Sequence, residues 1–427
     1  MGNFCRYIDR MKNIQLRKVR FLGLLLLVLP FFSLFGAEIT VPRLELATRG
    51  RVNDDGEFAL STNALVDIAL DGGYKFGVKL GLAFAAADLG KAFAYRDFRF
   101  LPLPPGTAVS DIEYNSMTDQ MNKIIDSSAV LSFRVAKATA RDLFNLPLEL
   151  SYFIGYGDTF GSGEEFAARY GLFQIPTDFT GFYYFPDGID GNINRRYEGI
   201  HQVQGTGFSF ALTRWNGFVP MVYLYQNLSD LETGGLSFAG ARYSGDFRLL
   251  FNKSGLSVET FGGITGRKNA GIQFRGGALA FFSSGTGTDF LFEAGIPGWE
   301  KGTKFGVDHL YFLIEPRLRF GIMAFHLTFF YHPLVYQGIK TDDERGRADL
   351  NFKIMFGDPV STGVQGGIES TLGVKIDDYD AMTVRLGPFV SFVSNGLLWN
   401  LKLRMNIMDY DAPYKMFELF AGIRTAY

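Results

Sequence analysis

The sequence is poor in the side chains on which disulfides, metal centres and many catalytic sites depend. It holds one cysteine, Cys5, and four histidines. A chain with a single thiol can close no internal disulfide and can build no thiolate metal site. His326 and His332 share one face of a predicted strand, but the rise per residue separates them by about 20 Å, too far to bind one metal ion. We therefore expect no metal and no cofactor.

Short catalytic and phosphate-binding motifs are also missing. The sequence contains no His-Glu-x-x-His, no Gly-x-Ser-x-Gly and no phosphate-binding glycine loop. Such patterns mark the commonest hydrolases and nucleotide-binding proteins. We expect a protein that is not an enzyme; an enzyme whose site assembles from distant residues is the lesser alternative.

Long apolar runs are rare, and one of them lies near the N-terminus. A basic lead-in that ends at Arg20 precedes Phe21–Ala37, which is uncharged, rich in Leu and Phe, and interrupted by Pro30. This layout is typical of a secretory signal peptide. We predict that residues 1–37 are removed on export, and translation from Met11 would leave residues 1–10 out altogether. An uncleaved anchor helix is the alternative interpretation.

The remaining chain, residues 38–427, carries a modest net negative charge. Six of the 42 basic residues and one of the 44 acidic residues precede Glu38, which leaves 36 basic and 43 acidic groups and a net charge of −7. This balance gives no electrostatic reason to expect nucleic acid as a partner. No break in composition divides residues 38–427, so we predict a single domain.

Alternation with a period of two residues is abundant, and the end of the chain shows it clearly. One strand face there is mostly apolar and consists of Phe417, Leu419, Ala421, Ile423, Thr425 and Tyr427. The opposite face holds Glu418, Gly422 and Arg424. A two-faced strand that ends on an aromatic residue resembles the last strand of Gram-negative outer-membrane β-barrel proteins. The resemblance implies outer-membrane lipid around the chain and a barrel-assembly machinery that recognises Phe417, Leu419, Ile423 and Tyr427.

Asn395-Gly396 is a strong hairpin signal, because a type I′ turn needs positive φ at both central positions. A two-residue turn there predicts these apolar pairs on one face: Phe392 with Trp399, Val390 with Leu401, Pro388 with Leu403, Leu386 with Met405, and Val384 with Ile407. The other face then pairs polar residues such as Ser391 with Asn400. A slip of one residue would turn the charges of this hairpin toward lipid.

Three other turns predict registers by the same reasoning. Asn216-Gly217 predicts apolar-face pairs of Leu212 with Met221, Phe210 with Tyr223, and Phe208 with Tyr225. Gly321-Ile322 predicts Phe320 with Met323, Leu318 with Phe325, Pro316 with Leu327, Ile314 with Phe329, and Phe312 with Tyr331. A three-residue turn at Asp71-Gly72-Gly73 predicts Leu70 with Tyr74, Ile68 with Phe76, Val66 with Val78, Ala64 with Leu80, and Leu60 with Phe84.

Further runs have strand character, and they set the size of the fold. They are Leu44–Arg51, Ala129–Ala138, Leu146–Tyr156, Leu236–Arg242, Phe247–Asn252, Leu256–Ile264, Ile272–Phe282, Phe290–Ile296, Leu350–Phe356 and Val364–Ile376. The total is nineteen, whereas a single-chain bacterial barrel has an even number, so one strand is miscounted or hidden in 93–100 or 181–185. We predict an all-β fold, a transmembrane antiparallel β-barrel of 16–20 strands, with 18 the best estimate.

Two other interpretations of the pattern are open. Residues 320–339 carry no formal charge and could span a bilayer as a helix. Their apolar residues alternate, however, with Phe330 as the exception, and alternation favours a strand. A soluble β-sandwich also alternates, but its strands are shorter and its outward residues are polar.

Ionised residues of such a barrel must face the lumen, because Lys or Arg at mid-membrane costs about 2–4 kcal/mol on the lipid face. Alternation predicts these pore-lining residues, which would stay hydrated: Glu149, Arg275, Glu293, Glu315, Arg317, Arg319, Lys353, Glu369, Lys375, Arg385, Lys402, Arg404, Glu418 and Arg424. Glu315 and Arg317 are close enough to pair. The set predicts a wall of ion pairs, a solute path with a mild anion preference, or both.

Two long connections, residues 88–128 and 158–205, exceed the usual loop length. The second follows the fifth or sixth predicted strand, where general porins fold a loop into the barrel, and it resembles that loop in position and charge. The candidate constriction residues are Asp158, Glu164, Glu165, Arg195 and Arg196. A surface loop in solvent is the alternative.

The function that fits these features is passive diffusion of small hydrophilic solutes or ions through a porin-like channel. The principal alternative is a non-conducting surface protein, an adhesin or structural antigen, whose long loops bind a partner. A transporter of hydrophobic substrates is less favoured, since Leu44 already starts a strand and leaves no room for an N-terminal hatch. The sequence leaves open whether the chain forms a homo-oligomer.

Overall fold

The computed structural model describes residues 38–53, 56–86, 88–89, 129–161, 201–214, 217–227, 242–267, 271–332, 347–358, 361–375 and 382–425. The predicted signal peptide, residues 1–37, lies outside this part of the chain. So do most of the two long connections.

Strands make up nearly all of the described chain. Their bounds are β1 Glu38–Val52, β2 Phe58–Asp71, β3 Phe76–Ala86, β4 Ala129–Ala140, β5 Leu148–Phe160, β6 His201–Leu212, β7 Phe218–Asn227, β8 Arg242–Lys253, β9 Leu256–Arg267, β10 Ile272–Ser283, β11 Thr288–Glu300, β12 Tyr311–Phe320, β13 Met323–His332, β14 Arg347–Asp358, β15 Val364–Lys375, β16 Thr383–Ser394, β17 Leu397–Asn406 and β18 Phe417–Thr425. Short 3-10 helices lie in the connections: η3 Leu143–Asn145, η7 Val307–His309, η10 Ile407–Asp409 and η11 Pro413–Lys415. Within the described ranges, no helix has both the length and the apolar character needed to cross a bilayer.

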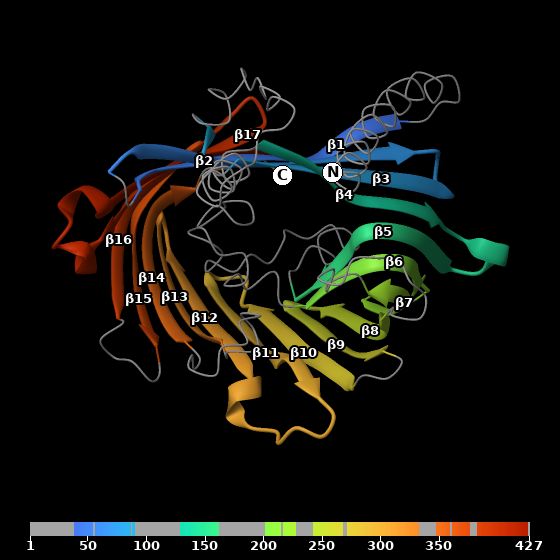
Figure 1. Cartoon of the computed structure of the whole chain (residues 1–427). Helices are drawn as coiled ribbons and strands as arrows, with labels where there is room; N and C mark the ends of the chain where they lie inside the picture. Colours follow the sequence, from blue (N-terminus) through green and yellow to red (C-terminus); the bar gives the residue numbers. More distant parts are fainter. Residues whose placement is uncertain are drawn as a thin grey trace, which may run out of the picture.

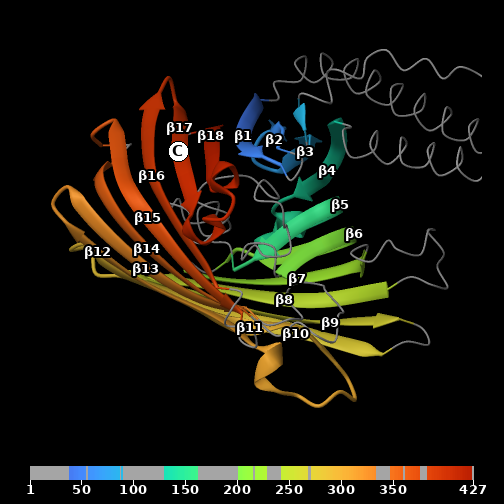
Figure 2. The same ribbon diagram turned by 60° about the vertical axis from the view of Figure 1, so that its left-hand side comes forward.

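The strands close into a single cylinder of 18 antiparallel strands. Each strand pairs with its neighbours in sequence, and β1 pairs with both β2 and β18. Figure 1 looks into the ring, with β1–β4 along the top and β13–β16 on the left, and Figure 2 shows β18 beside β1. The predicted architecture and the best estimate of 18 strands are confirmed.

Connections alternate in length around the cylinder. Those after even-numbered strands are short, for example 254–255, 321–322 and 395–396, whereas 87–128 and 161–200 both follow odd-numbered strands. Because successive strands run in opposite directions, the short turns gather at one end of the barrel and the long connections at the other. Outer-membrane barrels share this asymmetry, with their short turns on the periplasmic side.

Inner and outer faces follow the predicted period of two. On β17, Leu401 and Leu403 are exposed on the outer face, while Lys402 and Arg404 are buried on the inner face. Apolar side chains occupy outward positions all around the ring. Such a surface is stable against lipid rather than water, and a closed ladder leaves no strand edge unpaired in the bilayer. The barrel is therefore of the transmembrane type.

The turn at 395–396 sets the predicted register of its hairpin. Both positions have positive φ, 52° and 74°. Phe392 lies opposite Trp399, and their rings stack 6.1 Å apart on the outer face. The outermost predicted pair is wrong, because Ile407 begins η10 and therefore cannot extend the ladder to Val384.

The turn at 321–322 is confirmed as well. Phe312 lies opposite Tyr331, as predicted. Within the segment 320–339, residues 323–332 form the strand β13, and residues 333–339 lie outside the described part of the chain. Phe330, the exception in the alternation, points inward and is 0% exposed. Its large apolar side chain faces inward because the barrel interior is itself apolar at this place.

The predicted register of β2 and β3 is wrong by four residues. Leu70 lies opposite Val78, not Tyr74, because the connection takes up residues 72–75 rather than a three-residue turn. An even shift leaves every side chain on its predicted face. The turn type was misjudged, but the inside and outside of the hairpin were not.

The predicted register of β6 and β7 is wrong by one residue, which reverses a face. Phe210 lies opposite Val222, not Tyr223. Consequently Met221, Tyr223 and Tyr225, expected on the lipid face, are buried inside the barrel. The prediction assumed that large apolar side chains face lipid, and this part of the interior does not obey that rule.

Eighteen of the nineteen predicted strands overlap a strand of the barrel by more than one residue. The predicted strand Phe247–Asn252, for example, lies within β8, which runs from Arg242 to Lys253. The separately predicted Leu236–Arg242 lies outside the described residues except for Arg242, the first residue of β8. The candidate hidden strands 93–100 and 181–185 also lie outside them.

Candidate functional site

The barrel interior is the candidate functional site, and its wall differs from sector to sector. We call the inner faces of β5–β13 the apolar sector, those of β14–β18 the paired sector, and those of β1–β4 the exposed sector. Each name refers to the side chains that dominate the inner face. The sectors follow one another around the ring in Figure 1.

The apolar sector contains a hydrophobic core like that of a soluble protein. Its buried members are Phe153, Phe160, Val203, Ala211, Val219, Met221, Tyr223, Tyr225, Leu250, Phe261, Leu279, Leu291, Tyr311, Leu313 and Phe330. A single sheet face can bury such side chains only if something packs on it. Part of the chain must therefore lie inside the barrel against these strands.

The end of β5 and the start of β6 supply part of that packing. The ring of Phe160 lies 5.4 Å from that of Phe261 on β9, and the ring of His201 lies 5.5 Å from that of Tyr311 on β12. Neighbouring strands are about 4.8 Å apart, so β6 and β12 are separated by roughly 29 Å along the wall. These contacts therefore cross the interior.

A kink in β5 lets its end turn inward. The β5–β6 ladder shifts register at Tyr156 and Asp158, and bulges of this kind bend a strand. Gly155 has φ of 91°, and a Cβ there would collide with the carbonyl oxygen of Arg134. Glycine is required at this position both for the left-handed backbone and for the close approach of β4.

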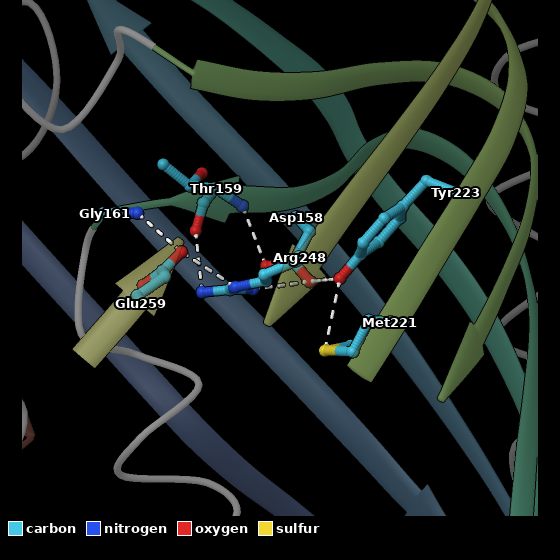
Figure 3. Close-up of polar contacts among 7 residues, drawn as sticks. All are labelled: Asp158, Thr159, Gly161, Met221, Tyr223, Arg248 and Glu259. Atoms are coloured by element: carbon cyan, nitrogen blue, oxygen red, sulfur yellow. Dashed lines mark hydrogen bonds and ion pairs between the residues drawn. The ribbon is translucent and has the colours of Figure 1, made fainter. Parts of the chain in front are cut away.

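An ion network fixes the inward-turned end of β5 to the wall (Figure 3). Arg248 on β8 is fully buried and bridges two carboxylates: Nη1 lies 3.2 Å from Asp158 Oδ2 and Nε lies 2.8 Å from Glu259 Oε1. The Tyr223 hydroxyl donates to Asp158 Oδ2 at 2.6 Å. The Thr159 carbonyl accepts a hydrogen bond from Arg248 Nη2 at 3.4 Å. The Arg248 guanidinium thus lies between two carboxylates, and Lys137 also interacts with Asp158.

A second set of hydrogen bonds holds both ends of the β5–β6 connection. The Gly161 N–H donates to Glu259 Oε1 at 2.9 Å. His201 Nε2 lies 2.8 Å from the Tyr311 hydroxyl, which donates to Glu293 Oε1 at 2.9 Å. A Cβ at Gly161 would lie 2.5 Å from Glu293 Oε1, and the φ of 72° at this position favours glycine.

Arg275 on β10 makes a third anchor. Its Nε and Nη2 donate to the carboxylate of Asp246 at 3.0 and 2.6 Å. Its Nη1 donates to the Gln202 carbonyl at 2.9 Å, and its Nη2 also contacts the Tyr225 hydroxyl. Bidentate pairing of this kind fixes the guanidinium plane, and through Gln202 it fixes the start of β6.

The paired sector is organised around Glu369 on β15. Lys402 reaches this carboxylate from β17 by passing over Gly387 on β16, where a Cβ would lie 3.3 Å from Lys402 Cε. Lys353 lies opposite Glu369 in the β14–β15 ladder. Asn351 Nδ2 donates to Glu369 Oε1 at 2.7 Å. Glu369 thus lies among two lysines and an amide.

Glu418 on β18 has a similar position beside the barrel closure. Arg404 on β17 forms an ion pair with it, and Arg49 Nη1 on β1 lies 3.9 Å from Glu418 Oε1. The Arg404 guanidinium lies 4.8 Å from the centre of the Phe420 ring. Around Glu369 and Glu418 the cations outnumber the carboxylates.

In the exposed sector, charged side chains reach water. Arg43 Nη2 lies 3.0 Å from Glu45 Oε2, and both side chains remain partly exposed. The Lys79 side chain is 43% exposed although its Nζ lies 2.9 Å from Asp67 Oδ2. Ionised groups and solvent thus meet on this part of the inner wall.

The predicted pore-lining residues all occupy inward positions, but their surroundings differ. Seven are buried: Glu293, Glu315, Arg317, Lys353, Glu369, Lys402 and Arg404. The others are partly or fully exposed: Glu149, Arg275, Arg319, Lys375, Arg385, Glu418 and Arg424. The expectation that all stay hydrated is wrong for the buried set, because packing inside the barrel excludes water there. Glu315 and Arg317 form the predicted pair at 2.6 Å.

The predicted constriction set is only partly within the described residues. Asp158 belongs to β5 rather than to a loop, since that strand continues to Phe160 and β6 begins at His201. Glu164, Glu165, Arg195 and Arg196 lie outside the described residues. The constriction therefore stays a prediction, whereas the inward position of its two described ends is a feature of the fold.

Several charged residues of the interior were not predicted. They are Arg43, Arg49, Asp67, Lys79, Arg134, Asp246, Arg248 and Glu259. Alternation could have found most of them, since Asp67 lies between the outward Val66 and Ile68. Arg134 could not be found in this way, because it lies at a bulge where the period of two is interrupted.

No family model matches the chain, and the comparison with curated proteins gave no significant match. Among solved structures, the chain is similar to OccAB4 of Acinetobacter baumannii at 10% identity, covering 91% of this chain and 97% of that one, with a TM-score of 0.48. It is similar to OccAB2 of the same bacterium at 12% identity, with the same coverage and a TM-score of 0.48. It is also similar to the outer membrane protein OpdK of Pseudomonas aeruginosa at 9% identity, covering 91% and 98%, with a TM-score of 0.45.

Proposed function

We propose that this chain is a porin-like channel of the bacterial outer membrane, through which small hydrophilic solutes or ions diffuse passively. One observation carries the proposal: a closed cylinder with an apolar outside has water-exposed, ionised side chains on its inside, Lys79 above all. A charged group that faces the lumen keeps its hydration, whereas the same group facing lipid would be strongly unfavourable. A barrel of 18 strands is wide enough to enclose an aqueous path.

The path we propose is off-centre. The core of the apolar sector and the inward ends of β5 and β6 fill one side of the interior, while the exposed sector lies on another side. Hydrated solutes then pass along β1–β4, and wall charges set their preference. Phe160 and His201 lie inside the barrel, which supports a narrowing that the connection between β5 and β6 would extend.

We further propose that residues 1–37 are a cleaved export signal and that the barrel-assembly machinery inserts the chain. The outward position of Phe417 and Leu419 on β18 supports an assembly signal at the C-terminal strand. Ile423 and Tyr427 complete that predicted signal, and Tyr427 lies outside the described residues. Assembly into a homo-oligomer stays a prediction.

The absence of cysteine from residues 38–427 allows a direct test. Lys79→Cys places a thiol on the inner face of β3, and Leu401→Cys, the matched control, places one on the lipid face of β17. In a planar bilayer, we expect a charged, water-soluble thiol reagent to reduce the single-channel current of the first variant and to leave the second unchanged. A refolded wild-type protein that gives no current steps would refute the channel.

The alternative of a non-conducting surface protein has one observation in its favour: the long connections gather at one end of the barrel. It predicts no current steps from a correctly folded barrel, together with ligand binding that is lost when residues 88–128 or 162–200 are shortened. Circular dichroism of the refolded protein separates this outcome from misfolding.

A further inference from the structure

We propose that Lys79, Arg134 and Lys137 form an anion-binding site on the inner face of β3 and β4, where a buried Asp67 holds the first two in place. Its ligands would be small solutes that carry a carboxylate or phosphate group. The inference rests on the proposed channel function, because it names the charge class that the lumen favours.

Asp67 is well placed to position cations without occupying the lumen itself. It is 1% exposed, with Lys79 Nζ 2.9 Å from its Oδ2 and Arg134 Nη1 3.3 Å from its Oδ1. Gly81 lies opposite it on β3, and a Cβ there would lie 2.7 Å from Asp67 Oδ1 and 2.7 Å from Val135 Cγ1. The missing side chain of Gly81 therefore makes the space in which the carboxylate lies behind its two partners.

Lys137 adds a third cation and an electrostatic conflict. The β3–β4 ladder places it directly opposite Lys79. Like charges in this position destabilise a sheet. Asp67 has two cationic partners, which leaves an excess of one positive charge at this carboxylate, and Lys137 also interacts with Asp158. An anionic solute would neutralise the excess.

The cations beside Asp67 differ in solvent exposure from those beside Glu369 and Glu418, two other carboxylates that lie beside more than one cation. The lysines beside Glu369 and the arginines beside Glu418 are at most a few per cent exposed, so those groups stabilise the wall. By contrast, the side chain of Lys79 is 43% exposed and that of Arg134 19% exposed. The nitrogens that face away from Asp67 can thus reach a passing anion.

The test is the reversal potential of the refolded channel in a planar bilayer under a potassium chloride gradient. Replacing both Lys79 and Lys137 by Gln should lower the anion-to-cation permeability ratio about threefold, the order expected for charges a few ångströms from a hydrated path. Lys79→Arg keeps the charge and should keep the ratio. Lys304→Gln, which removes one charge from the exposed connection 301–310, should also leave it unchanged.

Binding is tested separately with inorganic phosphate. Added phosphate should reduce the chloride current of the wild type at least threefold more strongly than that of the double lysine variant. A double lysine variant that conducts normally, with an unchanged permeability ratio and unchanged phosphate sensitivity, would overturn the anion-binding site while leaving the channel function intact. Absence of current from the wild type would instead overturn the proposed function.

Discussion

Arg248 is the side chain whose removal should show whether the inward end of β5 is held by charge. It is fully buried, and it pairs with Asp158 at 3.2 Å and with Glu259 at 2.8 Å. Arg248→Met preserves much of the length of the side chain but leaves two buried carboxylates without this cation. Breaking a buried ion pair in this way typically costs about 3–5 kcal/mol, although the Tyr223 hydroxyl would still donate to Asp158.

Equilibrium unfolding of the refolded barrel in guanidinium chloride, followed by tryptophan fluorescence, measures this cost. The side chain of Arg248 takes no part in the backbone ladder, and the substitution leaves the backbone pairing of β8 with β7 and β9 in place. The variant should therefore still fold, with its free energy of unfolding lowered by about 3 kcal/mol. Its single-channel conductance should rise, because the end of β5 is no longer fixed against β8 and β9.

Glu259→Gln supplies the control. In the double variant with Arg248→Met, the glutamine removes one uncompensated charge, so the double variant should recover at least 1 kcal/mol relative to Arg248→Met alone. A loss below about 1 kcal/mol in Arg248→Met, or no recovery in the double variant, would refute the view that this network anchors β5.

Other positions test the lipid-facing surface and the paired sector. Leu401→Arg should destabilise the barrel by about 2–4 kcal/mol, against less than about 1.5 kcal/mol for Leu401→Met; equal effects in the unfolding assay would show that this face does not meet lipid. The fluorescence of Trp399, measured as the difference between the wild type and Trp399→Phe, should be quenched by lipids with brominated acyl chains. Stronger quenching of this fluorescence by aqueous acrylamide would contradict the outward position of Trp399. Gly387→Val should cost about 3 kcal/mol, because a Cβ lies 2.5 Å from the Leu403 carbonyl and 3.3 Å from Lys402 Cε. Gly366→Ala, where the nearest atom is a carbonyl oxygen at 3.7 Å, should cost less than about 1 kcal/mol, and similar losses at both glycines would argue against close packing of β17 at Gly387.

Prediction from the sequence worked best where the determinants are local. At 395–396 two residues with positive φ fix a type I′ turn, and the register of β16 and β17 follows from it. At 72–75 the turn chemistry was misjudged, yet the faces of β2 and β3 were right, since an even shift preserves them. Counting strands gave nineteen, and the even number required of a single-chain barrel favoured 18.

Prediction of the site was less complete, because a side chain's partner depends on strands far away in the sequence. Alternation could place Glu369 and Lys402 on the inner face, but it could not show that Lys402 crosses Gly387 to reach Glu369. It also missed Arg134, whose bulge interrupts the period. The sequence therefore predicted which residues face inward better than what they contact.

The sequence by itself determined a two-faced, antiparallel cylinder, because a period of two and tight turns are properties of neighbouring residues. Only the tertiary structure decided that part of the interior is apolar. Met221 and Phe330 are as apolar as many lipid-facing residues, and nothing local distinguishes a side chain that meets acyl chains from one that packs inside. That choice depends on the inward turn of β5 and β6, which brings Phe160 and His201 across the barrel to strands that are distant in the chain.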